Sequence, residues 1–324
     1  MQPPVPPLKF LAACLSLIIL AVVSMFVGVS DVALAALLEG DAKAWLVLLD
    51  SRVPRTLALL FAGAGMAVSG MIMQMLAQNR FVEPSTAGTV ESAGFGMLLV
   101  MLFAPGLPVY GKMLVATTCA LAGTGLFLAI LRQIPLRSTL MVPLVGIMLG
   151  GVISAVTSFL AYRYDLLQSM GAWTTGDFSA VLRGRYELLW LSLGLTAAAY
   201  LAADRFTVMG MGEAFSSNLG INYRRVVMFG LVIVAMVTAS VVVTVGMVPF
   251  VGLIVPNIVS MALGDRLRRS LPWIAAFGAG LVIACDIIGR IVIEPFEIPV
   301  GTVLGAVGSA VFLYLVLRRN ARAA

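Results

Sequence analysis

The chain has 324 residues, of which 61% are hydrophobic and only 11% are charged, and its formal net charge is +6. Its mean hydropathy of +1.06 excludes an ordinary soluble domain and is typical of a bundle of membrane helices. The basic residues lie in separate loops, so the positive charge does not indicate nucleic-acid binding. We predict an all-α, polytopic membrane protein that forms a single domain over residues 1–324.

Cysteine and histidine usage excludes several kinds of chemistry. Cys14, Cys119 and Cys285 lie inside apolar runs without paired spacing, which argues against disulfides and against a metal site. Histidine is absent, so the commonest general base and metal ligand is missing. No segment reads G-x-x-x-x-G-K-[ST], so any ATP is bound by another chain. We expect no catalytic residue, no metal and no cofactor on this chain.

About ten runs are apolar enough to cross a bilayer, each needing roughly 20 residues. The proline-rich, weakly basic start does not resemble a secretory leader, so the first run is expected to remain as a span. The run over 250–263 is short and contains Gly252 and Pro256, which indicates a broken or tilted helix. The predicted spans are 10–29, 54–77, 88–104, 113–131, 140–161, 188–203, 226–247, 250–263, 271–290 and 300–317.

Two connections between these spans are long. Leucines and Trp45 recur at near-helical spacing over 30–55, which predicts an amphipathic helix at the membrane interface. Residues 162–187 form a polar connection between the fifth and sixth spans.

The distribution of basic residues predicts the orientation. An excess of Lys and Arg on alternate loops marks the cytoplasmic side, and it places both termini there. Only four acids share that side, namely Glu83, Asp204, Glu213 and Asp265. The basic residues there are Lys9, Arg80, Arg132, Arg137, Arg205, Arg224, Arg225, Arg266, Arg268, Arg269, Arg318, Arg319 and Arg322.

A polar break at 204–225 interrupts the apolar sequence near its middle. Residues 213–219 have the composition of a short helix, and Gly220 is a stop signal for it. With arginines at its edges, this segment is expected on the cytoplasmic face. Two interpretations stay open from the residues alone: a docking point for a soluble partner, and a solvated connector.

Two acids, Glu91 and Asp286, fall at or near membrane depth, where ionisable residues are candidates for function. Arg290 follows Asp286 by four residues, so a helix would pair them on one face. Glu91 follows a re-entry at Pro84 and is expected near the interface. A proton-coupled carrier would need such acids in a connected relay.

Arg52 and Arg55 flank Pro54 on the predicted outer side, although the positive-inside rule expects Lys and Arg mainly on the cytoplasmic side. One interpretation is contact with an acidic partner surface or an anionic substrate. The other is pairing with Asp50 or with lipid phosphate.

Several stretches together resemble the permease family of bacterial ATP-binding-cassette importers for ferric siderophores, haem and cobalamin. Each stretch is weak alone, but they occur in the family's order over almost the full length. They are RVPRT at 52–56, GAGMAVSG at 63–70, MQ at 73–74, NRFVEP at 79–84, Trp173 with Gly176, GEA at 212–214, LG at 219–220, FVGLIVP at 250–256, Asp286 with Arg290, and EIPVG at 297–301.

The resemblance implies the type II importer architecture: a ten-span permease in the bacterial inner membrane, paired with an identical or paralogous second copy. A cytoplasmic ATPase dimer, which would bind ATP and Mg²⁺, and a periplasmic or lipid-anchored binding protein would complete the importer. Arg52, Arg55 and Arg290 match arginines that receive acids of the binding protein. Asn79 and Phe81 match the loop that closes the cytoplasmic end of the pathway. The coupling segment, which would sit in a cleft of the ATPase, is matched by Gly212, Glu213, Ala214, Phe215, Ser216, Leu219, Gly220, Ile221 and Asn222.

Two positions depart from the family pattern. Asn257 stands where a His is usual after Val-Pro, and Asn79-Arg80-Phe81 stands where Asn-Pro-Leu is usual. This variant resembles a subgroup of siderophore permeases, which favours a ferric siderophore over haem or cobalamin. The main rival hypothesis is a secondary transporter driven by an ion gradient through Glu91 and Asp286. A membrane enzyme has almost no support, because no nucleophile cluster or metal site is apparent.

Overall fold

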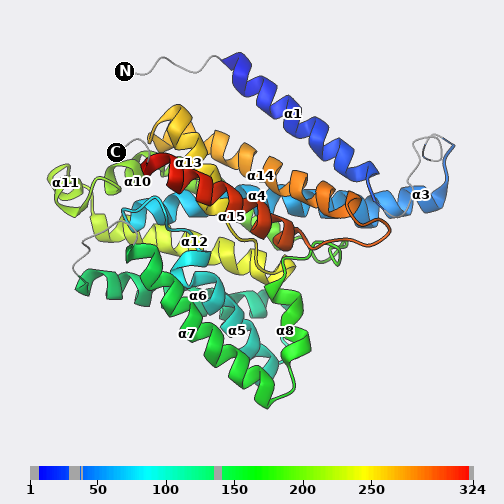
Figure 1. Ribbon diagram of the computed structural model, residues 1–324, viewed down its shortest axis with the longest axis horizontal. Coiled ribbons are helices and arrows are strands. Elements are labelled where there is room, and N and C mark those ends of the chain that lie inside the picture. The colour runs from blue at the N-terminus through cyan, green and yellow to red at the C-terminus, as the bar shows by residue number, and fades with distance from the viewer. Residues whose placement is uncertain (1–6, 29–36, 38, 135–140, 321–324) are drawn as a thin grey trace.

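The computed structural model describes residues 7–28, 37, 39–134 and 141–320, and every regular element within them is a helix (Figure 1). The predicted all-α fold is therefore confirmed. The α-helices are α1 Pro7–Phe26, α3 Ala42–Val47, α4 Val53–Leu76, α5 Thr89–Phe103, α6 Val109–Gln133, α7 Met141–Arg163, α8 Leu167–Thr174, α9 Leu189–Leu201, α10 Ala203–Met209, α11 Glu213–Asn218, α12 Tyr223–Val245, α13 Val251–Leu263, α14 Leu267–Ile291 and α15 Val300–Asn320.

Six helical stretches among the described residues are long and apolar enough to cross a membrane. They are Leu8–Phe26, Ala42–Leu76, Val109–Gln133, Met141–Arg163, Tyr223–Val245 and Leu267–Ile291. The shorter apolar helices, of 10–17 residues, fall on the other four predicted spans: Thr89–Phe103, Leu189–Leu201, Val251–Leu263 and Val300–Tyr314. Every predicted span thus contains a helix, while the count of ten membrane crossings stays a prediction.

The helix expected over 30–55 is present from Ala42 onward, but it continues into the next span and is not a separate element, while its position at a membrane interface stays a prediction. From Ala42 the chain is helical without a break into α4, because the π-helical turn Leu48–Arg52 joins α3 to α4. Pro54 lies just after this π-helical turn, which interrupts the regular i→i−4 hydrogen-bond pattern near a residue that has no N–H to donate. Residues 30–36 and 38 of that prediction lie outside the described residues. The connection 162–187 also contains a helix that the sequence analysis missed, α8.

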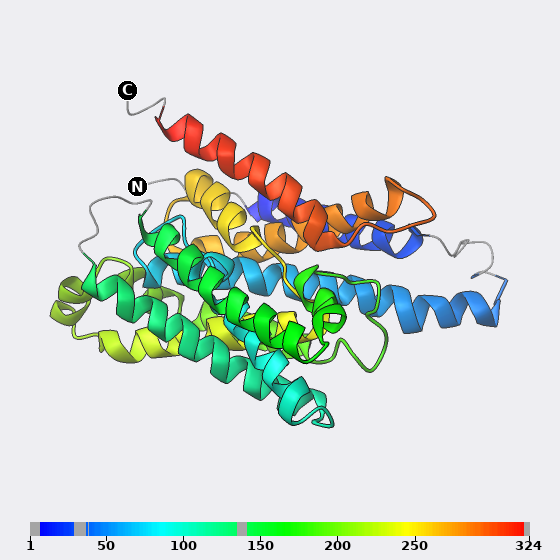
Figure 2. The same cartoon turned by 60° about the horizontal axis from the view of Figure 1, so that its bottom comes forward.

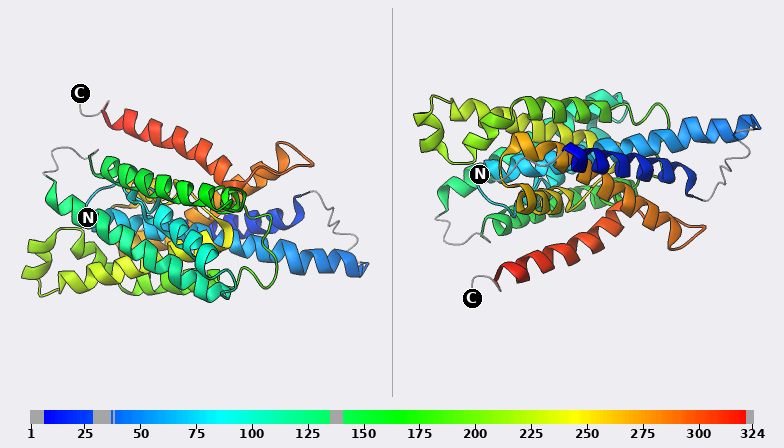
Figure 3. Two further views of the ribbon diagram at one scale, coloured as in Figure 1. Left: turned by 90° about the horizontal axis from the view of Figure 1, so that it is seen from below. Right: turned by 90° about the horizontal axis from the view of Figure 1, so that it is seen from above.

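The helix α4 forms the centre of the molecule. In the stretch Ala42–Leu76, which contains α4, 83% of the most apolar part is buried, against 6% for Leu8–Phe26 of α1. Glycines let its backbone approach two neighbours closely. A Cβ added at Gly63 would lie 2.6 Å from the carbonyl oxygen of Gly278 on α14. A Cβ added at Gly70 would lie 2.1 Å from the carbonyl oxygen of Gly252 on α13. In the views from below and above, α4 (blue to cyan) runs from one end into the middle of the bundle, whereas α15 (red) lies along one edge (Figure 3).

The helices run roughly along the long axis of the molecule, so its two ends carry different segments (Figures 1 and 2). Helices α10 and α11 lie at one end, together with the C-terminal end of α15. Helix α3 and the loop between α14 and α15 lie at the other end. The segments predicted to bind the ATPase and the external binding protein are thereby separated by the length of the bundle.

Candidate functional site

The polar break at 204–225, which holds the predicted coupling residues and is called the coupling segment below, includes α11 and nearly all of α10. Helix α11 covers Glu213–Asn218, and Gly220 follows it with φ 74°, so the predicted short helix and its stop signal are confirmed. Gly212 precedes it with φ 106°, a value that favours glycine. The buried Ser216 hydroxyl donates to the carbonyl oxygens of Gly212 at 2.8 Å and Val208 at 3.1 Å, which folds α11 back onto α10. This segment is therefore a defined helical corner.

The side chains of this corner divide into two groups. Ile221 packs against the main hydrophobic core, and Asn222 Oδ1 accepts from the backbone N–H of Arg225 and caps α12. Ala214 is exposed, and the large apolar side chains Phe215 and Leu219 are 48% and 58% exposed at the end of the molecule. These two side chains lie four residues apart at the end of the molecule that is predicted to meet the ATPase, and their role in docking stays a prediction.

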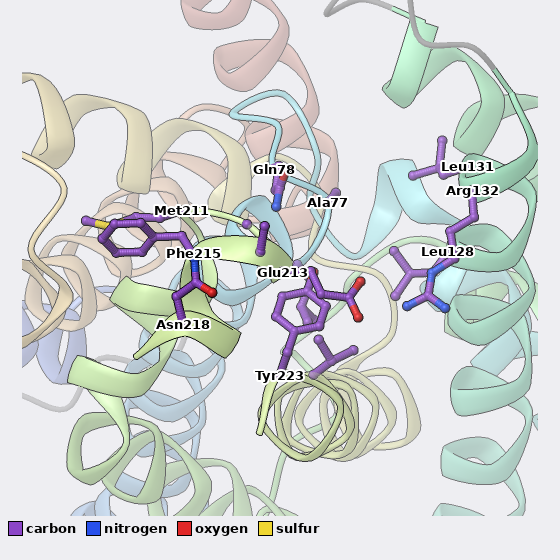
Figure 4. A pocket seen from close by; sticks show the side chains of 14 residues that line it. Ala77, Gln78, Leu128, Leu131, Arg132, Met211, Glu213, Phe215, Asn218 and Tyr223 are labelled. Carbon is purple, nitrogen blue, oxygen red and sulfur yellow. The ribbon is translucent and has the colours of Figure 1, made fainter. Parts of the chain in front are cut away.

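A pocket of about 700 Å³ lies beside α11, between it and the ends of α4, α6 and α12 (Figure 4). Its walls are mixed: Leu76, Leu131 and Val227 are apolar, whereas Glu213 and Arg132 are charged. The Glu213 carboxylate and the Arg132 guanidinium face one another across the pocket. Among the described residues, this pocket separates α11 from α6.

The predicted gate residues lie in the loop between α4 and α5. Asn79 is 4% exposed, and its Oδ1 accepts from the backbone N–H of Phe81 at 2.9 Å, which fixes the turn. The Phe81 ring meets Phe312 of α15 edge to face, with centroids 5.9 Å apart. The structure thus brings Asn79 and Phe81 together, while their action as a gate stays a prediction.

The three arginines predicted to receive the binding protein lie together at the opposite end, in a buried cluster. Arg55 pairs with Asp286 at 2.7 Å and with Glu297 at 2.8 Å. The predicted Asp286–Arg290 pair is present, so Asp286 lies between two guanidinium groups. Arg52, Arg55 and Arg290 are only 6%, 7% and 2% exposed.

This cluster ties α1, α4, α14 and the last loop together. Arg290 donates to the Ser24 hydroxyl at 2.6 Å, and Arg52 donates to the Val27 carbonyl oxygen at 2.8 Å. Asp50 lies near Arg183 at 3.7 Å, whereas the carboxylates that pair with Arg55 are those of Asp286 and Glu297, so pairing of Arg55 with Asp50 is wrong. Charges buried to this degree need such partners. Docking of a binding protein here stays a prediction, and it would require its acids to compete with these internal contacts.

Sequence reasoning did not assign two members of this cluster, Glu297 and Ser24. Glu297 stands in the EIPVG stretch that resembles the permease family, which was an available signal. Ser24 lies within an apolar run and carries no sequence signal. Glu91, the other acid expected near the membrane, lies outside this cluster. It lies against Gly150 of α7, where a Cβ added to Gly150 would be 3.2 Å from the Glu91 carboxyl carbon.

Comparisons with known proteins agree with this architecture. A family model described as the FecCD transport family matches residues 11–318. The petrobactin import system permease protein YclN of Bacillus subtilis is 49% identical over 95% of this chain and 97% of its own length. The petrobactin import system permease protein FatD of Bacillus anthracis is 43% identical over 96% of this chain and 91% of its own length. A solved metal-chelate type ABC transporter in an inward-facing conformation aligns with a TM-score of 0.81 at 25% identity, covering 96% of this chain and 99% of that chain.

Proposed function

The chain belongs to the FecCD transport family, and we propose that it is the permease of an ATP-driven importer that carries a ferric siderophore into the cytoplasm. The observation that supports this most strongly is the 49% identity, over nearly the whole of both chains, to a petrobactin import permease. The cargo class follows from that relative and from the second petrobactin permease, at 43% identity.

The proposed mechanism is alternating access. ATP binding and hydrolysis on a separate ATPase dimer would move α11, and packed helices would carry this movement to the gate loop. The exposed Phe215 and Leu219 support docking of the ATPase at α11, because the described part of the chain leaves 48% and 58% of these residues exposed. A second permease copy, identical or paralogous, and an external binding protein would complete the assembly. In this proposal the permease spans the bacterial inner membrane, and both of its termini lie in the cytoplasm.

The rival hypothesis of an ion-driven carrier has little support. Asp286 is held between Arg55 and Arg290, so its carboxylate already has two structural partners. Glu91 lies on α5 against Gly150 of α7, whereas Asp286 lies on α14. A proton relay needs connected acids. Glu91 and Asp286 pack against different helices, so the structure does not show them as connected members of a relay.

Substituting Phe215 and Leu219 by Ser is expected to weaken association with the ATPase about tenfold or more, because exposed apolar anchors dominate protein interfaces. Thermal stability of the permease is expected to stay within a degree or two of the parent, since both side chains are largely exposed. Binding of the separately purified ATPase to the permease in nanodiscs measures the effect. Phe103→Ser, which changes a phenylalanine 80% exposed elsewhere, is the matched control and should bind normally.

The assembly itself is tested by gentle purification of the tagged chain from its native membrane, with quantitative mass spectrometry of the copurified proteins. An ABC ATPase at matched stoichiometry is expected, and the permeases present distinguish a homodimer from a heterodimer. A chain that is recovered without any ATPase, and that carries substrate in ATP-free liposomes, would contradict the proposal.

A further inference from the structure

The loop between α4 and α5 is fastened along the whole length of α13. Glu83 contacts the start of this helix, Asn257 holds the loop at its middle, and Asp265 pairs with Arg80 just beyond its end. The predicted gate residue Phe81 lies within this fastened stretch. The contact of Phe81 with α15 is of a different kind, an aromatic edge contact with Phe312.

Glu83 makes the most buried of these contacts, being only 1% exposed. Its Oε1 accepts the backbone N–H of Phe250 at 3.0 Å and the hydroxyl of Ser85 at 2.5 Å. Its Oε2 lies beside Gly252, where an added Cβ would be 3.2 Å away. The first N–H groups of a helix lack intrahelical partners, and Glu83 Oε1 satisfies the one at Phe250. Burial nevertheless raises the pKa of the Glu83 carboxyl to about 7. Glu83 thus caps α13 from the gate loop.

The second contact joins the two positions that depart from the family pattern. The Asn257 side-chain amide donates to the carbonyl oxygen of Arg80 at 2.8 Å and to that of Leu253 at 2.7 Å. Arg80 stands where the family usually has proline, and Asn257 where it usually has histidine. Because these residues touch, the two departures form one local arrangement. The Arg80–Asp265 pair, at 2.6 Å, adds an exposed contact to it.

The fastened unit also reaches the coupling segment. The backbone N–H of Leu267, which begins α14 two residues after Asp265, donates to the Thr207 hydroxyl of α10 at 3.2 Å. Arg268 pairs with Asp204 of α10 at 2.5 Å. Contacts therefore run from α10 through the corner between α13 and α14 to Arg80 and the gate loop.

We propose that Glu83 is a positioning residue that fixes loop 79–86 onto α13, so that loop and helix move as one rigid unit when the coupling segment moves. The inference rests on the proposed function, because the movement in question is that of an importer. Through its contact with Phe250, Glu83 makes the gate residues follow α13. The contacts of Asn257 and Asp265 with Arg80 support this attachment. Removal of the carboxylate then uncouples the gate from α13 while the bundle remains assembled.

The test uses the permease with Cys14, Cys119 and Cys285 replaced by Ala, assembled with its ATPase and binding protein in liposomes, and ferric petrobactin as the probe. Glu83→Gln is expected to lower ATP-driven uptake about tenfold while ATP hydrolysis continues, because an amide oxygen accepts the hydrogen bonds of Phe250 and Ser85 more weakly than a carboxylate oxygen. Glu83→Asp, which keeps the charge on a shorter side chain, should give an intermediate loss. Arg80→Cys with Asn257→Cys, joined by a short bifunctional thiol reagent, should restore uptake by Glu83→Gln to within about twofold of the tethered parent, because the tether replaces the lost contact.

Unchanged uptake in Glu83→Gln, or a tether that forms without restoring uptake, would overturn the inference. The yield of the Arg80→Cys to Asn257→Cys cross-link gives a readout that does not depend on transport. It is expected to fall in Glu83→Gln and to stay unchanged in Glu91→Gln, which alters a glutamate held against α7 instead. Loss of ATP-driven uptake in the parent, with the cross-link yields as expected, would count against the proposed function and leave the role of Glu83 standing.

Discussion

Replacing Asp286 by Asn is expected to lower the free energy of unfolding by about 3–5 kcal/mol, because it leaves buried cations without their shared partner. Asp286 is 1% exposed and pairs with both Arg55 and Arg290. After the substitution Glu297, which pairs with Arg55, would be the remaining acid among the described members of the cluster. The loss is measured by unfolding in mixed micelles, followed by circular dichroism.

Two further variants make this prediction specific. Asp204→Asn breaks an ion pair whose side chains are 59% and 65% exposed, so its effect should stay below about 1 kcal/mol. Adding Arg290→Gln to Asp286→Asn removes the second charge and should recover part of the stability, since it lowers the number of uncompensated charges. Equal losses for Asp286→Asn and Asp204→Asn would show that the buried cluster is not a structural tie.

Replacing Gly70 by Ala is expected to force α4 and α13 apart. The added Cβ would lie 2.1 Å from the carbonyl oxygen and 2.2 Å from the Cα of Gly252, and these backbone atoms cannot rotate away as a side chain can. Overpacking of this kind costs about 1–3 kcal/mol and sometimes more. Because Gly252 lies in the first turn of α13, next to Glu83, ATP-driven uptake should also be lost. Unfolding in mixed micelles and uptake into liposomes measure the two effects.

The control for this substitution is Gly94→Ala in α5, where an added Cβ meets nothing within 4 Å. Its stability should equal that of the parent or exceed it by up to about 1 kcal/mol, which is the gain in helix propensity. Destabilisation of Gly70→Ala no greater than that of Gly94→Ala would contradict the close approach of α4 and α13.

Features that depend on neighbouring residues were predictable from the sequence. The helix α11 and its end at Gly220 follow from local composition, and the Asp286–Arg290 pair follows from four-residue spacing. Each predicted span contains a helix, because a long apolar run can be read directly from the sequence and such a run is helical where it crosses a membrane. The continuity of α3 with α4 was missed because Pro54 suggests a helix start, whereas a π-helical turn carries the helix through it.

Features that depend on residues far apart in the chain were not predictable in the same way. The contact between Arg55 and Asp286 joins positions 231 residues apart, and periodicity carries no information about it. Glu83 stands in a recognisable stretch, yet its partner Phe250 is 167 residues away and contributes a backbone N–H that any residue type except proline would supply. The resemblance located these stretches in the chain, but only the fold shows which of them touch.

Uptake of ferric petrobactin into liposomes distinguishes an ATP-driven importer from an ion-driven carrier. We expect uptake only when the permease is assembled with its ATPase and binding protein and supplied with ATP, and we expect Glu91→Gln to retain this uptake. Uptake by the permease alone, driven by an ion gradient without ATP and abolished by Glu91→Gln, would contradict the proposed function.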